Sequence, residues 1–223
     1  MPILNLDPGK LSETEVIRLA GGGVFPPDSP IQTVVKRAIT KGHALVEGTG
    51  TYVKFPAENT HDGILIHAGA LNIDPLPFPG TTRIYGVEAA VFFVVTIGHA
   101  LEREVDLCFL QRDPVGALFL DAVGSVAAEA VADRLTSVIA SEAEALGFRT
   151  SSRCSPGYCN WSLEIQKTVF RVLDGNGIGV ELTDSMLMIP RKSISGVVFL
   201  GKNLNPLNPC KNCKSPDCKD RRS

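Results

Sequence analysis

The sequence has no marked excess of charge of either sign. Its 22 Lys and Arg residues nearly balance 24 Asp and Glu residues, and the formal net charge is −2. A domain that binds nucleic acid usually carries a clear excess of basic residues. The composition therefore argues against nucleic-acid binding as the function.

Long hydrophobic runs and a targeting segment are also missing. The N-terminal stretch MPILNLDPGK lacks the basic start and apolar middle of a signal peptide. The longest strongly apolar run covers residues 89–101 and contains His99, whereas a helix that crosses a bilayer needs about 20 apolar residues. We therefore expect a cytoplasmic protein without membrane contact, in which this run forms a buried strand.

Cysteine is sparse except at the C-terminus, where Cys210, Cys213 and Cys218 lie among the last fourteen residues. A chain without a secretion signal is expected among reductants, where disulfides rarely persist. Metal binding or redox chemistry is therefore the better interpretation. The C-x2-C-x4-C spacing leaves a tetrahedral site one ligand short. The fourth ligand could be Cys159, Cys154, a histidine or a small molecule.

The order of predicted elements indicates a mixed α+β fold. Ser12 and Glu15 have the spacing of a capping box and predict a short helix over 11–20. Pro30 predicts the start of a second helix, which Gly42 can end. Strand patterns then dominate residues 43–97.

The second half of the chain contains the longest predicted helix. Asp113 and Pro114 mark its start, and its pattern continues to about Leu146. A short helix is predicted over residues 162–172, and two strands follow over 179–189 and 193–201. We therefore expect one α+β domain over residues 1–200 and a basic, Cys-rich tail over 201–223.

The stretch RCSPGYCNWS, residues 153–162, is the strongest candidate for a binding site. Pro156 and Gly157 predict a tight turn that exposes backbone N–H and C=O groups. Arg153 offers a planar guanidinium that can bind a carboxylate through two hydrogen bonds. Tyr158 adds a rigid flat face with a polar tip. These residues suit a zwitterionic ligand with a carboxylate, and equally a structural turn with a surface ion pair.

Two acidic residues one helical turn apart, Glu129 and Asp133, precede this stretch within an amphipathic pattern. Their spacing alone favours a solvated acidic helix face over a functional pair.

Three motifs in one order resemble the activation domain of cobalamin-dependent methionine synthase. They are AVADRLTSVIAS over 130–141, RCSPGY over 153–158 and LTDSMLMIPRKSISGVVF over 182–199. The resemblance covers roughly residues 80–200. It implies an activation-domain-like α+β fold, with a twisted, mainly antiparallel sheet packed by the long helix.

The resemblance also implies a ligand and roles for single residues. Domains of this family bind S-adenosylmethionine, and they serve the reductive remethylation of cobalamin that has slipped to the inert cob(II)alamin state. By position, Arg153 would hold the ligand carboxylate, and Tyr158 would pack beside the sulfonium. The backbone at Ser155 and Gly157 would contact the adenosine or amino-acid portion. Ser137 stands where the family has a supporting glutamate.

The sequence contains no module for binding corrinoid, folate or homocysteine. The resemblance therefore implies a stand-alone activation component, whose cobalamin is carried by a separate methionine synthase or other corrinoid methyltransferase protein. A low-potential electron donor would be a further partner. The alternative is a non-catalytic accessory module that binds a corrinoid protein or a metal.

The cysteines generate the first testable prediction. Cys159 would add a fourth thiolate to the three of the tail, and four thiolates hold either zinc or an iron–sulfur cluster. Only a cluster carries electrons, which favours the cluster, and Cys154 is expected to be packed away from it. Anaerobically purified protein should contain iron and absorb visible light, and Cys159→Ser should lose metal. Zinc alone would exclude an electron relay, and full metal content in Cys159→Ser would remove Cys159 from the site.

Overall fold

A computed structural model describes residues 1–23, 25–26, 29–78, 84–158, 161–173 and 175–205. Within them the main sheet has the strand order β1-β2-β4-β8-β5, with β3 paired to β2. All of these pairings are antiparallel. The strands are β1 (Ile3–Asn5), β2 (Thr49–Asn59), β3 (Ile64–Ile66), β4 (Ala89–Thr96), β5 (Arg149–Thr150) and β8 (Ser193–Gly201).

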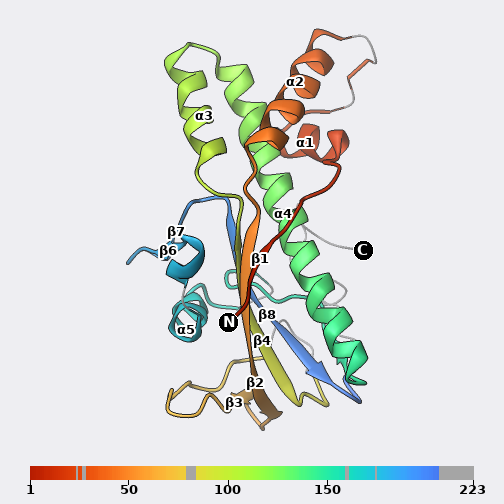
Figure 1. Cartoon of the computed structure of the whole chain (residues 1–223), viewed down its shortest axis with the longest axis vertical. Helices are drawn as coiled ribbons and strands as arrows, with labels where there is room; N and C mark the ends of the chain where they lie inside the picture. Colours follow the sequence, from red (N-terminus) through yellow and green to blue (C-terminus); the bar gives the residue numbers. More distant parts are fainter. Residues whose placement is uncertain (24, 27–28, 79–83, 159–160, 174, 206–223) are drawn as a thin grey trace.

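The helices divide unequally between the two faces and the upper end of this sheet (Figure 1). Helix α4 (Pro114–Ala145) runs most of the length of the molecule, and α1 (Glu13–Leu19), α2 (Pro30–Leu45) and α3 (Ala100–Leu110) surround its first half. Helix α5 (Ile165–Val172), a 3-10 turn (Gly175–Ile178) and the hairpin β6 (Glu181–Leu182) and β7 (Met188–Ile189) lie on the other side. The predicted α+β fold with a mainly antiparallel sheet and a long packed helix is confirmed.

Both faces of the sheet are buried, because successive side chains of a strand point to opposite faces. On β4, Val91, Phe93 and Val95 belong to the core shared with α4. Phe92 and Val94 belong to a second core on the α5 side. Every residue of β4 is buried, so the apolar run that predicted a buried strand is correctly interpreted up to residue 96.

Helix α3 is the longest element that the sequence prediction missed, beside the short strands β1 and β5. It begins four residues after β4 ends, inside the same apolar run, so the strand pattern hides its start. Its buried residues Leu101, Val105 and Cys108 recur at helical spacing. The shift from strand to helix comes at Gly98, which has a φ of +76° that favours glycine.

Two other predicted boundaries are wrong. Helix α2 does not end at Gly42 but continues to Leu45, because Gly42 is a packing position against α4 and not a C-cap. The predicted strand over residues 179–189 is a small hairpin, since only Glu181–Leu182 and Met188–Ile189 pair. Met186, within its turn, has a φ of +63°, which a continuous strand cannot accommodate.

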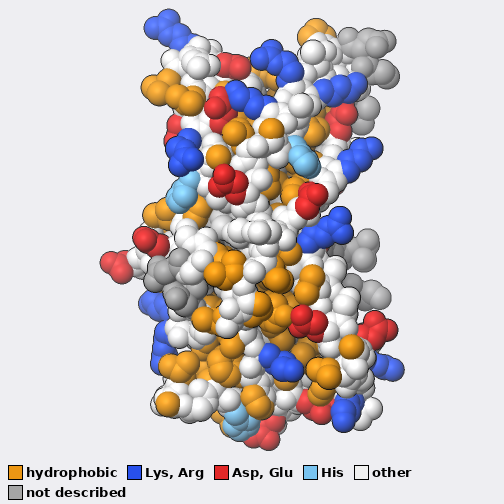
Figure 2. Space-filling view, viewed as in Figure 1, with side chains coloured by type: hydrophobic (Ala, Val, Ile, Leu, Met, Phe, Trp, Pro, Cys, Tyr) orange, Lys and Arg blue, Asp and Glu red, His pale blue; other side chains and the backbone are white. Residues whose placement is uncertain are grey.

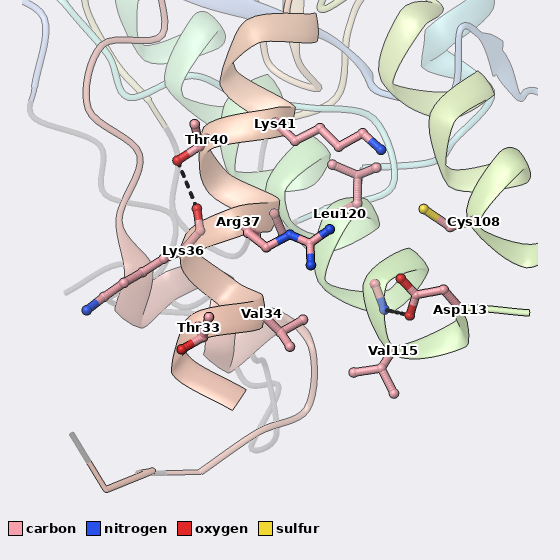
Figure 3. Close-up of a pocket in the computed structure, with 12 residues that line it drawn as sticks. Thr33, Val34, Lys36, Arg37, Thr40, Lys41, Cys108, Asp113, Val115 and Leu120 are labelled. Carbon is pink, nitrogen blue, oxygen red and sulfur yellow. Dashed lines mark hydrogen bonds between the residues drawn. The ribbon is translucent and has the colours of Figure 1, made fainter. Parts of the chain in front are cut away.

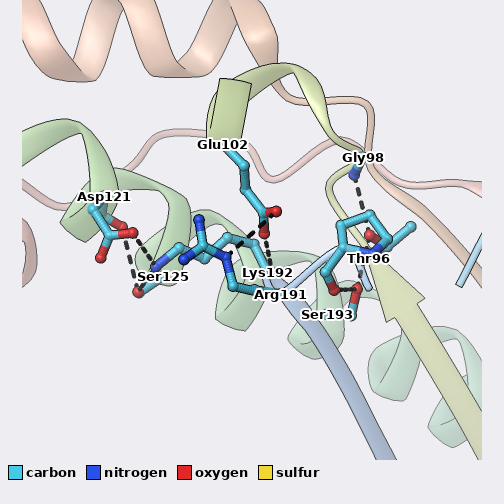
Figure 4. A network of polar contacts seen from close by, with 9 residues as sticks. Thr96, Gly98, Glu102, Asp121, Ser125, Arg191, Lys192 and Ser193 are labelled. Carbon is cyan, nitrogen blue, oxygen red and sulfur yellow. Dashed lines mark hydrogen bonds and ion pairs between the residues drawn. The ribbon is translucent and has the colours of Figure 1, made fainter. Parts of the chain in front are cut away.

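A polar network connects the helical end of the molecule to the sheet (Figure 4). The Lys192 ammonium lies 2.9 Å from both Asp121 Oδ1 and Ser125 Oγ of α4. The backbone N–H of Lys192 donates to Glu102 of α3 at 2.8 Å. Ser193 donates to Thr96 Oγ1 at 2.9 Å and so joins the ends of β4 and β8. The segment before β8 therefore fixes α3 and α4 relative to the sheet.

The far end of α4 is tied to β2 by one side-chain contact. The Tyr52 hydroxyl donates to the Glu142 carboxylate at 2.7 Å. Burial raises the pKa of Tyr52 to about 12, and the hydrogen bond and the charge of Glu142 act in the same direction. The contact stabilises the fold while the hydroxyl is protonated, so it is lost as pH rises through 10 toward this value.

Helix α4 is long and apolar enough to cross a membrane by length and composition alone, with a mean hydropathy of 1.6 in its most apolar window. More than half of that window is buried within the protein. A soluble core helix passes the same test, and the packing of α4 against α1, α2, α3 and the sheet accounts for its apolar character.

The packing of Gly42 generates a stability prediction. A Cβ atom there would lie 2.5 Å from Val123 Cγ1, and overpacking of this kind costs about 1–3 kcal/mol. Alanine is favoured over glycine in a helix by about 1 kcal/mol. We expect Gly42→Ala to lower the free energy of unfolding in the wild-type background but to raise it in Val123→Ala, as measured by urea unfolding. The same sign in both backgrounds would contradict the packing argument.

Candidate functional site

The candidate site lies at the edge of the main sheet, where residues 149–158 run beside β8. Thr150 faces Leu200, and Cys154 faces Val197. The chain thus advances four residues along this edge against three along β8, so one extra residue is inserted between the two pairs. Such an insertion bends a strand and redirects a side chain. The side chain that emerges from it toward α4 belongs to Arg153.

Arg153 pairs with two acidic residues of α4. Its Nη2 group donates to Glu129 Oε2, and its Nη1 lies 3.2 Å from Asp133 Oδ1. The Arg153 side chain is only 11% exposed, whereas those of Glu129 and Asp133 are 47% and 58% exposed. Both acids are about half exposed, as the prediction of a solvated acidic face implies, but they also compensate the nearly buried guanidinium, which needs opposite charge.

The predicted turn is present after Arg153. The Tyr158 N–H donates to Ser155 O at 3.2 Å, and Gly157 has a φ of +84°, as the third residue of a type II turn requires. The Gly157 N–H donates to Trp161 O at 3.1 Å, so the turn itself uses this donor. In the described part of the chain, the Ser155 N–H and the Gly157 C=O have no hydrogen-bond partner.

The turn is anchored by the residues that flank it. Cys154 exchanges two backbone hydrogen bonds with Val197, at 2.9 and 2.8 Å, and is buried as predicted. After the turn, Trp161 donates from its indole N–H to Pro77 O at 2.8 Å and packs edge-on against Phe199. Tyr158 itself is 53% exposed. The site therefore combines a turn that is hydrogen-bonded on both sides with an aromatic side chain open to solvent.

Ser137 lies one turn beyond Asp133 on α4. Its hydroxyl donates to the backbone carbonyl of Asp133, one turn earlier on the same helix, at 2.8 Å. Ser137 therefore does not take over the role of the family's glutamate carboxylate. The acidic groups beside Arg153 come instead from one and two turns earlier, at Asp133 and Glu129. The spacing of these residues at i, i+4 and i+8 was visible in the sequence, but nothing in it identified Arg153 as the partner.

The predicted metal ligands Cys159, Cys210, Cys213 and Cys218 lie outside the described residues, so the metal site stays a prediction. Among the residues that are described, no group of three or more His, Cys, Asp or Glu side chains could hold a metal ion. The roles predicted for Arg153, Ser155, Gly157 and Tyr158 toward a ligand also stay predictions.

The protein has an antiparallel sheet with one long helix along a face, and an arginine and a tight turn at the sheet edge. These features define it as an α+β protein of the activation-domain type. The chain belongs to the family described as "Vitamin B12 dependent methionine synthase, activation domain", whose model matches residues 85–208, more than half of its length. No curated protein matches the sequence.

A solved structure shares this fold. It is described as the crystal structure of the MetH reactivation domain bound to AdoHcy, and it superposes with a TM-score of 0.66. The identity is 16%, over 93% of this chain and 80% of that chain. The likeness extends over residues before the family match, so α1, α2 and the first strands are part of the same fold.

The ion pairs of Arg153 generate a stability prediction. Because either acid can compensate the guanidinium, Glu129→Gln or Asp133→Asn alone should cost about 1 kcal/mol or less, and the double variant about 3 kcal/mol or more. Guanidinium chloride unfolding measures this. The control is Glu164→Gln, which removes an exposed pair with Lys167 and should change little. If the double variant lost only the sum of two small single-variant losses in unfolding free energy, the two acids would not be compensating a buried charge on Arg153.

Proposed function

We propose that this protein takes part in the reductive reactivation of a cobalamin enzyme. S-adenosylmethionine binds at the Arg153 turn, and its methyl group is delivered to the corrinoid of a separate methionine synthase or other corrinoid protein. Membership of the activation-domain family supports this reaction class. A structure with the same fold is described as bound to AdoHcy, the compound that remains when S-adenosylmethionine gives up its methyl group.

One observation supports the ligand most strongly, which is the pairing of a nearly buried arginine with two half-exposed carboxylates. The amino-acid end of S-adenosylmethionine is a zwitterion with a carboxylate and an ammonium. Arg153 can hold the carboxylate through two parallel hydrogen bonds. Glu129 is exposed enough to accept the ammonium. A site with both signs of charge side by side suits a zwitterion better than a simple anion.

The turn supplies the remaining contacts. The Ser155 N–H and the Gly157 C=O offer one donor and one acceptor for the adenosine or amino-acid portion. The Gly157 N–H already donates to Trp161 O, so the expected backbone contact at Gly157 would use its C=O. The exposed face of Tyr158 can pack against the cationic sulfonium, as aromatic rings do with cations.

The protein's own contribution is orientation and electrostatics, because the cofactor and the donor supply the reactive atoms. Bound S-adenosylmethionine supplies the methyl group. A separate, low-potential electron donor supplies the one electron that the cobalt requires. The residues of the turn fix the donor at the edge of the sheet, where a corrinoid protein can approach. We also retain the proposal that Cys159, Cys210, Cys213 and Cys218 bind an iron–sulfur cluster, or zinc, and that a reducing cytoplasm is the setting.

The proposal is tested by calorimetric titration with two ligands. S-adenosylmethionine carries the amino-acid end, and 5′-methylthioadenosine keeps the nucleoside but lacks both charges of that end. Arg153→Lys should lose about 1.5–3 kcal/mol of binding free energy for S-adenosylmethionine, because an ammonium cannot form two parallel hydrogen bonds. Its affinity for 5′-methylthioadenosine should not change.

Arg149→Lys, an exposed arginine of β5 on the same sheet edge, is the matched control and should bind both ligands like the wild type. An Arg153→Lys variant that binds S-adenosylmethionine like the wild type would remove Arg153 from the site. No binding of S-adenosylmethionine, even with a corrinoid protein present, would leave the accessory-module function.

A further inference from the structure

A cavity lies at the helical end of the molecule, away from the Arg153 turn. It has a volume of about 720 Å³ and is formed by α2, the end of α3 and the first two turns of α4 (Figure 3). Sites for small organic ligands typically measure about 300–1,000 Å³. The size of the cavity therefore suits a small molecule.

Most of the cavity wall is apolar. Val34 of α2 faces Val115 of α4, and Leu120 of α4 and Cys108 of α3 line the other side (Figure 3). Ala38 of α2 lines the cavity as well. Ala38, Cys108 and Leu120 are buried, while Val115 is 49% exposed. The apolar wall therefore extends from the core to the surface, where the hydrocarbon part of a ligand can cover it.

Arg37 provides the charge in this cavity. Figure 3 shows its guanidinium pointing from α2 into the space between Leu120 and Val115. Among the described residues, no acidic group lies within ion-pair distance of Arg37. Several other Lys and Arg side chains are on this end of the surface (Figure 2).

The other charged groups near the cavity are already engaged. The Lys41 ammonium pairs with Glu104 of α3. The Asp113 carboxylate accepts the Gly116 N–H at 2.8 Å and caps α4, where the helix dipole offsets its negative charge. Lys36 also lines the cavity, but its side chain points away from it (Figure 3). Arg37 is therefore the group with charge to offer a ligand.

We propose that this cavity binds a small amphiphilic carboxylate. The carboxylate pairs with Arg37, whose planar guanidinium fits it through two hydrogen bonds. The hydrocarbon part covers Val34, Val115 and Leu120, with apolar burial as the driving force.

This site is separate from the Arg153 turn. Gly116, at the cavity, and Asp133, beside Arg153, lie on the same helix α4, and the rise of an α-helix places them about 25 Å apart. The cavity therefore adds a second ligand to the protein and takes no residue from the proposed S-adenosylmethionine site.

Calorimetric titration of the full chain with octanoate tests the proposal. Octan-1-ol has the same hydrocarbon without the charge, and acetate has the charge without the hydrocarbon. Octanoate should bind saturably and at least ten times more tightly than either. Arg37→Gln should weaken octanoate about tenfold or more, the scale of a charge-assisted hydrogen bond, and leave octan-1-ol unchanged. Arg149→Gln, an exposed arginine outside the cavity, should change neither.

Cys108 provides an independent readout, because its thiol lines the cavity. Bound octanoate should slow its alkylation by iodoacetamide, followed by mass spectrometry of the Cys108 peptide. Val34→Phe, which narrows the cavity at the wall that the hydrocarbon covers, should reduce both the heat of octanoate binding and the effect of octanoate on alkylation.

Equal affinity for octanoate and octan-1-ol, or wild-type octanoate affinity in Arg37→Gln, would overturn the proposal. Absence of saturable octanoate binding would overturn it as well. The titration of Arg37→Gln with S-adenosylmethionine separates the two sites, since that affinity should not change whatever the result with octanoate.

Discussion

Helix α4 is longer than the sheet that it covers. Its 32 residues span about 48 Å at the rise of an α-helix, whereas the nine residues of β8 span about 30 Å. The buried residues of α4 continue from Ala117 to Ala143, so the turns beyond the sheet need an apolar cover of their own. Helices α1, α2 and α3 supply it. The molecule therefore has a sheet end and a helical end on one axis (Figure 1).

This arrangement determines where ligands can bind. Strand β4 is buried on both faces, and its two neighbours β2 and β8 saturate its backbone. A ligand that needs backbone contacts therefore has access only at an edge. The edge beside β8 is partly unpaired because the extra residue near Arg153 interrupts the ladder. At the other end, packing three helices around α4 leaves the cavity lined by Arg37.

The sequence predicted the elements whose signals are local. Asp113 and Pro114 mark the start of α4, and the Ser12 hydroxyl caps α1 as its spacing indicates. The reciprocal half of that capping box is absent among the described contacts, because Glu15 pairs with Arg18 instead. The turn at Pro156 and Gly157 was predicted for the same reason, since proline and glycine restrict the backbone wherever they stand.

Features that depend on distant residues could not be predicted in this way. Glycine is a residue type that often ends a helix, so the sequence suggested a helix end at Gly42. Only the close approach of Val123 of α4 shows that Gly42 is needed for packing. Glu129 and Asp133 have the spacing of a solvated face, and only the redirected Arg153 makes them a pair. Of the candidate site, the residue types and the turn were predictable. The pairing of Arg153 with two acidic residues could be recognised only from the folded structure.

The chain contains one tryptophan, and its position has an optical consequence. Trp161 is 3% exposed, donates its indole N–H to the Pro77 carbonyl, and follows the turn of Tyr158 by three residues. A buried indole emits at shorter wavelength than a solvated one, so the intrinsic fluorescence of the folded protein arises from a single, shielded emitter beside the proposed site. Any movement of the turn that opens this indole to water will shift the emission to the red. The protein thus contains its own spectroscopic reporter at the edge of the sheet.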